Sequence, residues 1–176
     1  MMIYKSKELE KKAALQVAEL MAAAARTAPK GKGTDRLEIL VVDGTDKEAL
    51  SHEMRRIAAE TGTAFFERDA GNLDNSIAVV LVGTRNSVAG VPVCGFCGFK
   101  DCVENEKNGG ICAIAVSDLG IAVGSAVSVA ADHRCDNRIM FSAGKAALRL
   151  HYFSDEVIIA YGIPLALRGK SPFFDR

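Results

Sequence analysis

Four cysteines dominate the chemistry that this sequence offers, because they fall within the stretch 94–114, CGFCGFKDCVENEKNGGICAI. Their spacing is C-x2-C-x4-C-x9-C, through Cys94, Cys97, Cys102 and Cys112. Thiolates are the ligands of iron–sulfur clusters and are common ligands of zinc. The pattern therefore predicts a metal centre held by these four side chains, either a [4Fe–4S] cluster or a zinc ion.

The spacing favours iron over zinc. Zinc sites built from four cysteines consist of two short C-x2-4-C pairs as a rule, and here only Cys94 and Cys97 form such a pair. Gly95 and Gly98 let the backbone wrap closely, so its N–H groups can point at cluster sulfides. We predict the iron–sulfur site first and keep zinc and incidental structural thiols as alternatives. Cys135 lies outside the motif and is interpreted as an ordinary thiol.

Composition and charge limit the classes of function that this chain can have. The chain has 176 residues, 49% of them hydrophobic, and 22 basic residues balance 22 acidic ones. A net charge of zero without a polybasic run argues against a nucleic-acid or anionic-membrane binder. The first 25 residues carry charges within an Ala-rich stretch and do not resemble a secretory signal. We expect a cytoplasmic protein that is not embedded in a membrane, and clustered thiols in that compartment favour metal binding over disulfides.

The hydrophobic periodicity predicts one α+β domain over residues 1–176, with an inserted ferredoxin-like Cys module at 94–112. The expected helices are 6–28, a second one ending at Gly62, 119–134 and 141–153, and the expected strands are 37–44, 77–83 and 156–164, the last ended by Pro164. The segment 63–76 is interpreted as a short helix and a loop.

Three local signals refine the helices. Thr45 and Glu48 have the spacing of a capping box at the start of the second helix. Ser117 and Asp118 offer an N-cap for the helix 119–134. In the first helix an apolar face is expected, formed by Leu9, Ala13, Val17, Leu20, Met21 and Ala24.

The helix 119–134 also has a face of small residues, Gly120, Gly124 and Ser128. Glycine destabilises a helix, so a reason for it is expected. Close packing against a helix or another subunit is favoured over the approach of a planar cofactor.

The stretch CGFCGFKDC, with a last Cys after a Gly-rich turn, resembles the four-iron ferredoxin-type domain of corrinoid iron–sulfur proteins. The chain as a whole is similar to a family of uncharacterised prokaryotic proteins described as containing a ferredoxin domain. That similarity is carried by residues 25–33, the Cys segment, 117–140 and 161–176.

A weaker resemblance is to FMN-dependent nitroreductases. It rests on the helix, Ala28-Pro29, loop and strand order, and on the GIP and basic residues near the end. It implies a nitroreductase-like sheet flanked by helices, a homodimer, and Arg168 and Lys170 as contacts of a flavin phosphate. The Arg-x-Ser-x-Arg start of those enzymes is absent, and KGKGTDR (30–36) stands where they have Asn-x-Gln-Pro.

Three functional hypotheses follow. The first is an iron–sulfur protein that passes electrons to a redox partner protein, and the second is an FMN-dependent reductase fed by the cluster. The third is a protein in which zinc only stabilises the Cys loop. No acid–base pair or activated nucleophile is recognisable, so the catalytic residues of any enzyme activity are not identified by the sequence.

Overall fold

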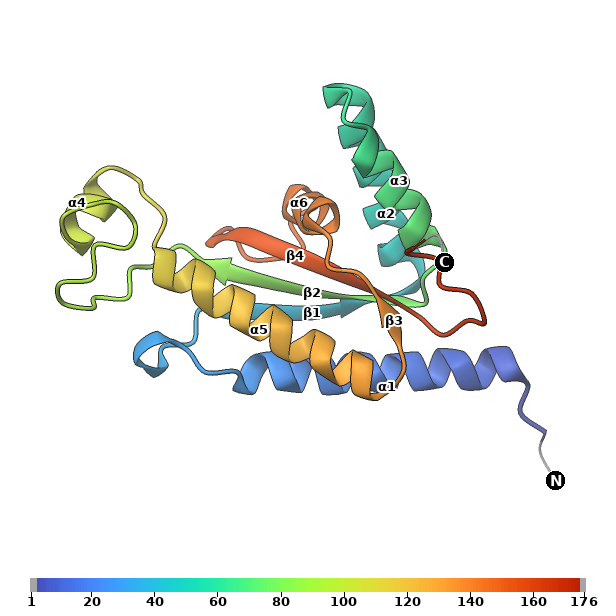
Figure 1. Ribbon diagram of the computed structural model, residues 1–176. Helices are drawn as coiled ribbons and strands as arrows, with labels where there is room; N and C mark the ends of the chain where they lie inside the picture. The colour runs from blue at the N-terminus through green and yellow to red at the C-terminus, as the bar shows by residue number, and fades with distance from the viewer. Residues whose placement is uncertain (1–2, 175–176) are drawn as a thin grey trace.

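An antiparallel sheet forms the centre of the computed structural model, which describes residues 3–174 (Figure 1). Within these residues the sheet has four strands in the order β1-β2-β4-β3. The strands are β1 (Leu37–Val42), β2 (Ala78–Arg85), β3 (Asp136–Asn137) and β4 (Val157–Ala166). Because β2 and β4 run antiparallel, with Ala78 opposite Leu165, the end of β2 lies beside the start of β4. The predicted α+β class is confirmed.

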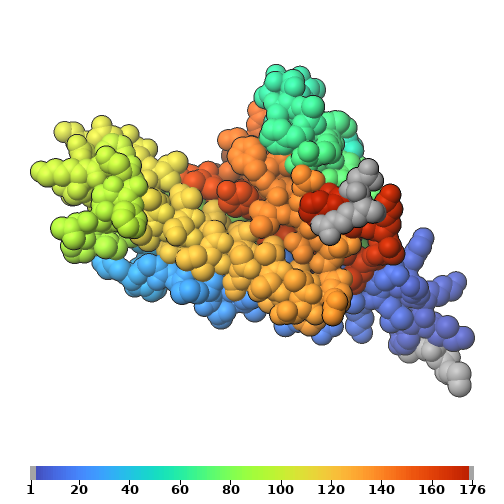
Figure 2. All heavy atoms as spheres, viewed as in Figure 1, coloured from blue at the N-terminus to red at the C-terminus, as the bar shows by residue number. Residues whose placement is uncertain are grey.

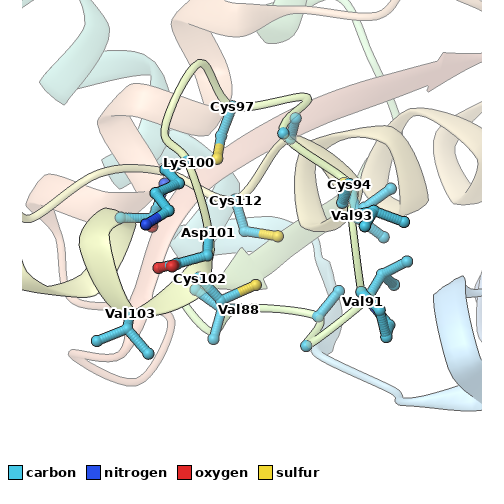
Figure 3. A pocket seen from close by; sticks show the side chains of 17 residues that line it. Val88, Val91, Val93, Cys94, Cys97, Lys100, Asp101, Cys102, Val103 and Cys112 are labelled. Atoms are coloured by element: carbon cyan, nitrogen blue, oxygen red, sulfur yellow. The ribbon is translucent and has the colours of Figure 1, made fainter.

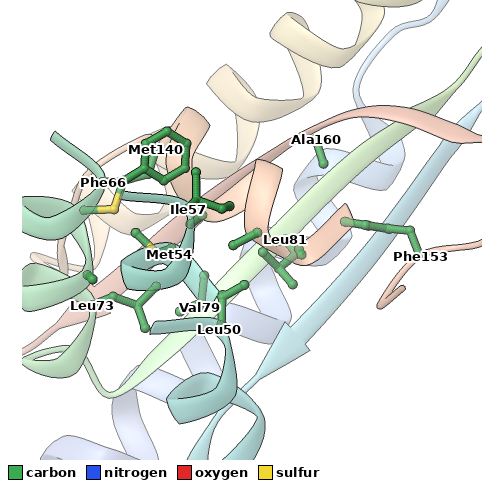
Figure 4. Close-up of a cluster of buried hydrophobic side chains, with 14 of the residues drawn as sticks. Leu50, Met54, Ile57, Phe66, Leu73, Val79, Leu81, Met140, Phe153 and Ala160 are labelled. Atoms are coloured by element: carbon green, nitrogen blue, oxygen red, sulfur yellow. The ribbon is translucent and has the colours of Figure 1, made fainter. Parts of the chain in front are cut away.

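Helices cover both faces of the sheet. One face carries α1 (Ser6–Thr27) and α5 (Ala113–Asp132), and the other carries α2 (Gly44–Thr61), α3 (Ala64–Asp74) and α6 (Phe141–Arg149) (Figure 1). The side chains of β2 alternate between the two cores, as the pleat of a strand requires. Val79 and Leu81 lie in the core under α2, α3 and α6, shown in Figure 4, and Val80 and Val82 lie in the core under α1 and α5.

Both faces of β2 are thus buried, which explains its uninterrupted apolar run. The strand predicted at 77–83 is confirmed, and so is the left-handed C-cap at Gly62, where φ is +67°.

The face that α1 buries matches the expected one only in part: Val17 and Met21 are buried as predicted, whereas Ala13 is exposed. Ala14, Val17, Ala18, Met21 and Ala25 are buried, whereas Leu9 and Leu20 are 51% and 42% exposed. Small alanines let α1 lie close to α5 and the sheet, so the buried face follows the alanines rather than the largest apolar residues.

The two predicted helix starts are wrong. α2 begins two residues earlier than expected, with Asp43 rather than Thr45 as N-cap and no side-chain capping bond, so Thr45 and Glu48 do not form a capping box. α5 begins at Ala113 with Cys112 as N-cap, and Ser117 and Asp118 lie inside it. A tertiary partner accounts for Asp118, which is buried and faces Arg36 from a distant segment.

Other boundaries differ by a few residues. The segment 63–76 is mostly the helix α3, and α6 ends at Arg149. Pro164 does not end its strand, because it lies within β4 opposite Val79. The neighbouring Gly162 exchanges both its backbone hydrogen bonds with Met140 on the β3 side. By alternation the missing N–H of Pro164 also faces that side, past the end of the short strand β3.

α5 is the one described helix that is long and apolar enough to cross a membrane, judged by length and composition alone. Its buried side chains, including Leu119, Ala122, Val123 and Ala126, pack into the core shared with α1 and the sheet. This is the position of a core helix in a globular fold.

Candidate functional site

The predicted insertion belongs to a longer segment, residues 86–112, which from here on is called the Cys module. This segment leaves the fold at the end of β2 and returns at the first residue of α5. It contains the short helix α4 (Cys102–Lys107) and projects from one end of the sheet (Figures 1 and 2). The predicted insertion at 94–112 thus lies in a single excursion of the chain, with both ends attached to the body.

All four motif cysteines line one cavity of about 320 Å³ in this module, here named the thiol cavity. Cys94, Cys97 and Cys102 are half-buried, Cys112 is buried, and all four thiols are free. Figure 3 shows the sulfur atoms of Cys97, Cys102 and Cys112 turned toward the interior of the cavity, with Cys94 at its edge. The structure therefore brings together residues that are up to 18 positions apart in the sequence.

The backbone around the first two cysteines is a tight turn. Gly95 and Gly98 have φ of +60° and +85°, and the Gly98 N–H donates to the Gly95 carbonyl over 3.0 Å. Residues with a Cβ rarely adopt these angles. The turn folds Cys94 and Cys97 around the same cavity, as proposed from the sequence.

The third and fourth cysteines are placed by α4 and the turn after it. Asp101 is the N-cap of α4, and its carboxylate accepts the Glu104 N–H over 2.9 Å. The Gly110 N–H donates to the Asn105 carbonyl over 2.8 Å, which closes the turn before Cys112. A Cβ at Gly110 would lie 2.6 Å from Asn105 Nδ2, so this turn packs tightly against α4.

The donor set fits a four-iron cluster. Such a cluster takes four cysteine thiolates, and four free thiols surround one mainly apolar cavity here. In residues 3–174, no three His, Cys, Asp or Glu side chains are gathered closely enough to hold one metal ion. A single zinc ion needs sulfurs at about 2.3 Å from one point.

Cys135 lies apart from this cavity. It is buried in the core with α1 and α5, and its Sγ lies 3.8 Å from the Ala166 carbonyl oxygen. Burial, and secondly the charge of Asp136, raise the pKa of this thiol to about 11. A thiol that stays protonated is a poor ligand and nucleophile, which agrees with its interpretation as an ordinary thiol.

Arg168 and Lys170 line a second, open depression of about 740 Å³ at the opposite end of β4. We call it the basic groove. Two further arginines, Arg68 and Arg138, line it as well, and so do Phe173 and Phe174. Arg138 lies over the Phe174 ring, 5.5 Å from its centroid.

Arg68 comes from α3 and Arg138 from the segment after β3, both far from Arg168 in the sequence. The Arg168 guanidinium donates to Asn75 Oδ1 over 3.1 Å, which ties the C-terminal segment to the end of α3. Among residues 3–174, the groove and the thiol cavity share no lining residue.

The small-residue face of α5 is exposed. Gly120, Gly124 and Ser128 are all solvent-exposed, and a Cβ at either glycine would meet nothing within 4 Å. Nothing in residues 3–174 packs on this face, so packing within the described chain is not its explanation.

The fold and site define a class: a nitroreductase-type α+β scaffold that carries a four-cysteine module. The structure is similar to that of an oxidoreductase containing FMN, with a TM-score of 0.62, 11% identity, and coverage of 88% of this chain and 67% of that one. For a nitroreductase with bound FMN from Desulfitobacterium hafniense, the TM-score is 0.61 and the identity 15%, with coverage of 92% of this chain and 82% of that one. For an iodotyrosine deiodinase bound to FMN and 3-iodo-L-tyrosine, the TM-score is 0.58 and the identity 15%, with coverage of 92% of this chain and 83% of that one. These likenesses establish the nitroreductase fold.

Sequence relatives identify the family. Residues 108–176 match the family described as "Uncharacterized protein containing a ferredoxin domain (DUF2148)". An "Uncharacterized protein" of Archaeoglobus fulgidus is 39% identical over 99% of this chain and 98% of its own length. The chain belongs to this ferredoxin-domain family. Family and fold together suggest a redox role.

Proposed function

We propose that the protein is an iron–sulfur electron-transfer protein whose [4Fe–4S] cluster is held by Cys94, Cys97, Cys102 and Cys112. The observation that carries the proposal is the convergence of these four free thiols on one cavity. The ferredoxin-domain family and the redox enzymes that share the fold support it.

The residues of the module would bind and shield the cluster. When bound, a cluster of this type accepts and donates one electron at a time. Val88, Val91 and Val103 line the cavity and would limit the access of water, and the Gly98 N–H donates to the Gly95 carbonyl in the turn that carries Cys97. Hydrogen bonds and solvent exposure of this kind set the reduction potential.

The test is purification without oxygen, followed by measurement of iron, zinc, acid-labile sulfide and the visible spectrum. About four iron and four sulfide per chain, with visible absorption that bleaches on reduction, are expected. The Cys102→Ser variant should lose most of the iron, and the matched control Cys135→Ser should keep it. One zinc per chain and a colourless protein would overturn the proposal in favour of a structural zinc site.

The basic groove favours a second candidate, an FMN-dependent reductase that receives electrons from the cluster. Four cationic side chains and two phenylalanines line the groove, which suits a ligand with a phosphate and an aromatic ring. In this candidate Arg168 and Lys170 contact the flavin phosphate.

Titration with FMN, followed by flavin fluorescence, tests this candidate. The double variant Arg168→Ala/Lys170→Ala should weaken binding about tenfold or more, because charge-assisted hydrogen bonds are lost. Lys145→Ala, which removes an exposed cation of α6 outside the groove, should bind like wild type. Failure of the wild-type protein to bind FMN would remove the reductase from consideration.

The proposal extends to assembly and location. We propose a homodimer that uses the exposed small-residue face of α5, a separate redox partner protein as electron donor or acceptor, and a cytoplasmic location. Light scattering of the wild type and of Gly124→Leu tests the dimer. A wild-type monomer, or a Gly124→Leu dimer of unchanged affinity, would contradict it.

A further inference from the structure

Arg36 is a buried cation at the base of the Cys module. It is 5% exposed and follows the loop that leads from α1 to β1. Its Nε donates to Ser87 Oγ over 2.7 Å, and its Nη2 donates to the Val88 carbonyl over 3.2 Å. Ser87 and Val88 form the first stem of the module, between the end of β2 and Cys94. The guanidinium therefore holds this stem directly.

Asp118 is the corresponding anion on the second stem of the module, which is the start of α5 (113–118). It lies in the second turn of α5, six residues after Cys112, and is 5% exposed. Its Oδ2 lies 3.8 Å from Arg36 Nη1, and its Oδ1 accepts the Gly31 N–H over 2.9 Å. One buried ion pair thus connects the two stems, and the four cysteines lie between these stems in the sequence.

The loop before β1 is the third segment held at this point. Lys32 Nζ donates to the Gly90 carbonyl over 3.2 Å, and a Cβ at Gly31 would lie 2.5 Å from Ile114 Cγ2. The loop therefore contacts the first stem at Gly90 and the second stem at Ile114 as well as at Asp118. It closes the base of the module from the side of α1.

The geometry of the pair indicates that it fixes spacing rather than simply adding stability. Asp118 Oδ2 is one of two buried side-chain polar atoms without a hydrogen-bond partner in residues 3–174. The other is Asn105 Oδ1, in a residue that lines the thiol cavity. Removing two charges from water costs free energy, and an ion pair that leaves one oxygen without a hydrogen bond offsets little of that cost. What the pair does provide is contact with three separate segments, the loop before β1, the stem at Ser87 and Val88, and the start of α5.

We propose that Arg36 and Asp118 are positioning residues for the thiol centre: they set the separation of the stem before Cys94 from the helix start at Cys112. The inference rests on the proposed function for the identity of the bound group. The positioning itself is a property of the chain and can be measured without a cluster.

The first measurement is hydrogen–deuterium exchange on the reduced, metal-free, full-length protein. Arg36→Met should speed the exchange of the first stem (86–93) and of the start of α5 (113–118) together, on the order of tenfold or more. Exchange in β2 and β4 should stay unchanged. Arg36→Lys, which keeps the buried charge but loses the separate guanidinium contacts to Ser87 and Val88, should restore only part of the protection. Arg26→Met is the matched control, because it removes an exposed ion pair with Asp35 near the same loop.

The double variant Arg36→Met/Asp118→Leu separates positioning from stability. Replacing both buried charges by apolar groups is commonly neutral or stabilising for a fold. We expect it to recover the melting temperature but not the protection of the two stems. After anaerobic reconstitution it should also hold severalfold less iron and sulfide, and its residual cluster should have a shifted midpoint potential.

The outcomes distinguish the two proposals. Unchanged exchange of the stems in Arg36→Met, or full recovery of protection in the double variant, would overturn the positioning role. Wild-type protein that holds no iron, while the stems of Arg36→Met still lose protection together, would overturn the proposed function and leave the positioning role intact. Equal iron content and potential in wild type and the double variant would show that the pair does not act on the thiol centre.

Discussion

The five cysteines should divide into four site thiols and one inert thiol when the reduced, metal-free protein is modified. Cys135 is 3% exposed, and its pKa is raised from 9.0 to about 11. At pH 8 a thiol with pKa 9.0 is about 9% thiolate, whereas one with pKa 11 is about 0.1% thiolate. Ionisation alone therefore makes Cys135 about 100-fold slower than an ordinary thiol, and burial slows it further.

The assay is a time course with a thiol-specific disulfide reagent, with peptide mass spectrometry to locate the labelled cysteines. The slow phase of the wild type should belong to Cys135 and be missing in Cys135→Ser. Because the pKa lies near 11, the rate of this phase should rise about tenfold for each pH unit from about pH 7 to 10. Labelling of Cys135 at the rate of a model thiol at pH 8, or a rate that levels off below pH 9, would refute the reasoning.

Three further predictions test the fold and the module. Gly144→Ala would place a Cβ 1.9 Å from a β4 backbone oxygen, so it should cost about 3 kcal/mol of unfolding free energy or more, measured with denaturant; Gly71→Ala, with nothing within 4 Å, should be neutral or stabilising. Hydrogen bonds from Ser154, first its side chain and then its backbone N–H, hold the pKa of Glu38 below 4.5, so the stability that Glu38 contributes above that pH is lost as the pH falls through its folded-state pKa. Acid unfolding should show the advantage of wild type over Glu38→Gln shrinking below pH 4.5; a constant difference would contradict this. Gly110→Ala, whose Cβ would lie 2.6 Å from two side chains, should lower iron retention severalfold with little change in melting temperature, and equal iron would refute the tight turn.

Local sequence signals predicted the elements whose environment is simple. The run 77–83 is apolar throughout because both faces of β2 are buried, and Gly62 marks a helix end because its backbone needs a positive φ. The four cysteines were also predicted as one group, and they line one cavity. In each case the requirement is visible within a few neighbouring residues.

Long-range partners explain the failures. Asp118 looks like an N-cap in the sequence, but its partner Arg36 is 82 positions away and the helix begins before it. Arg68 and Arg138 join Arg168 only because α3, β3 and the C-terminal segment meet at one end of the sheet. No periodicity or spacing contains that information.

The two candidate sites lie at opposite ends of the sheet. The Cys module follows Arg85 at one end of β2, and the basic groove follows Ala166 at the other end, where β4 lies opposite Ala78. Eight residues of extended strand separate these ends by roughly 25 Å. If both sites hold redox groups, an electron that passes between them within one chain must cover this distance, which favours transfer between two chains. Reduction of the groove ligand should then slow when the proposed homodimer dissociates on dilution, and linking two copies in tandem should remove that dependence.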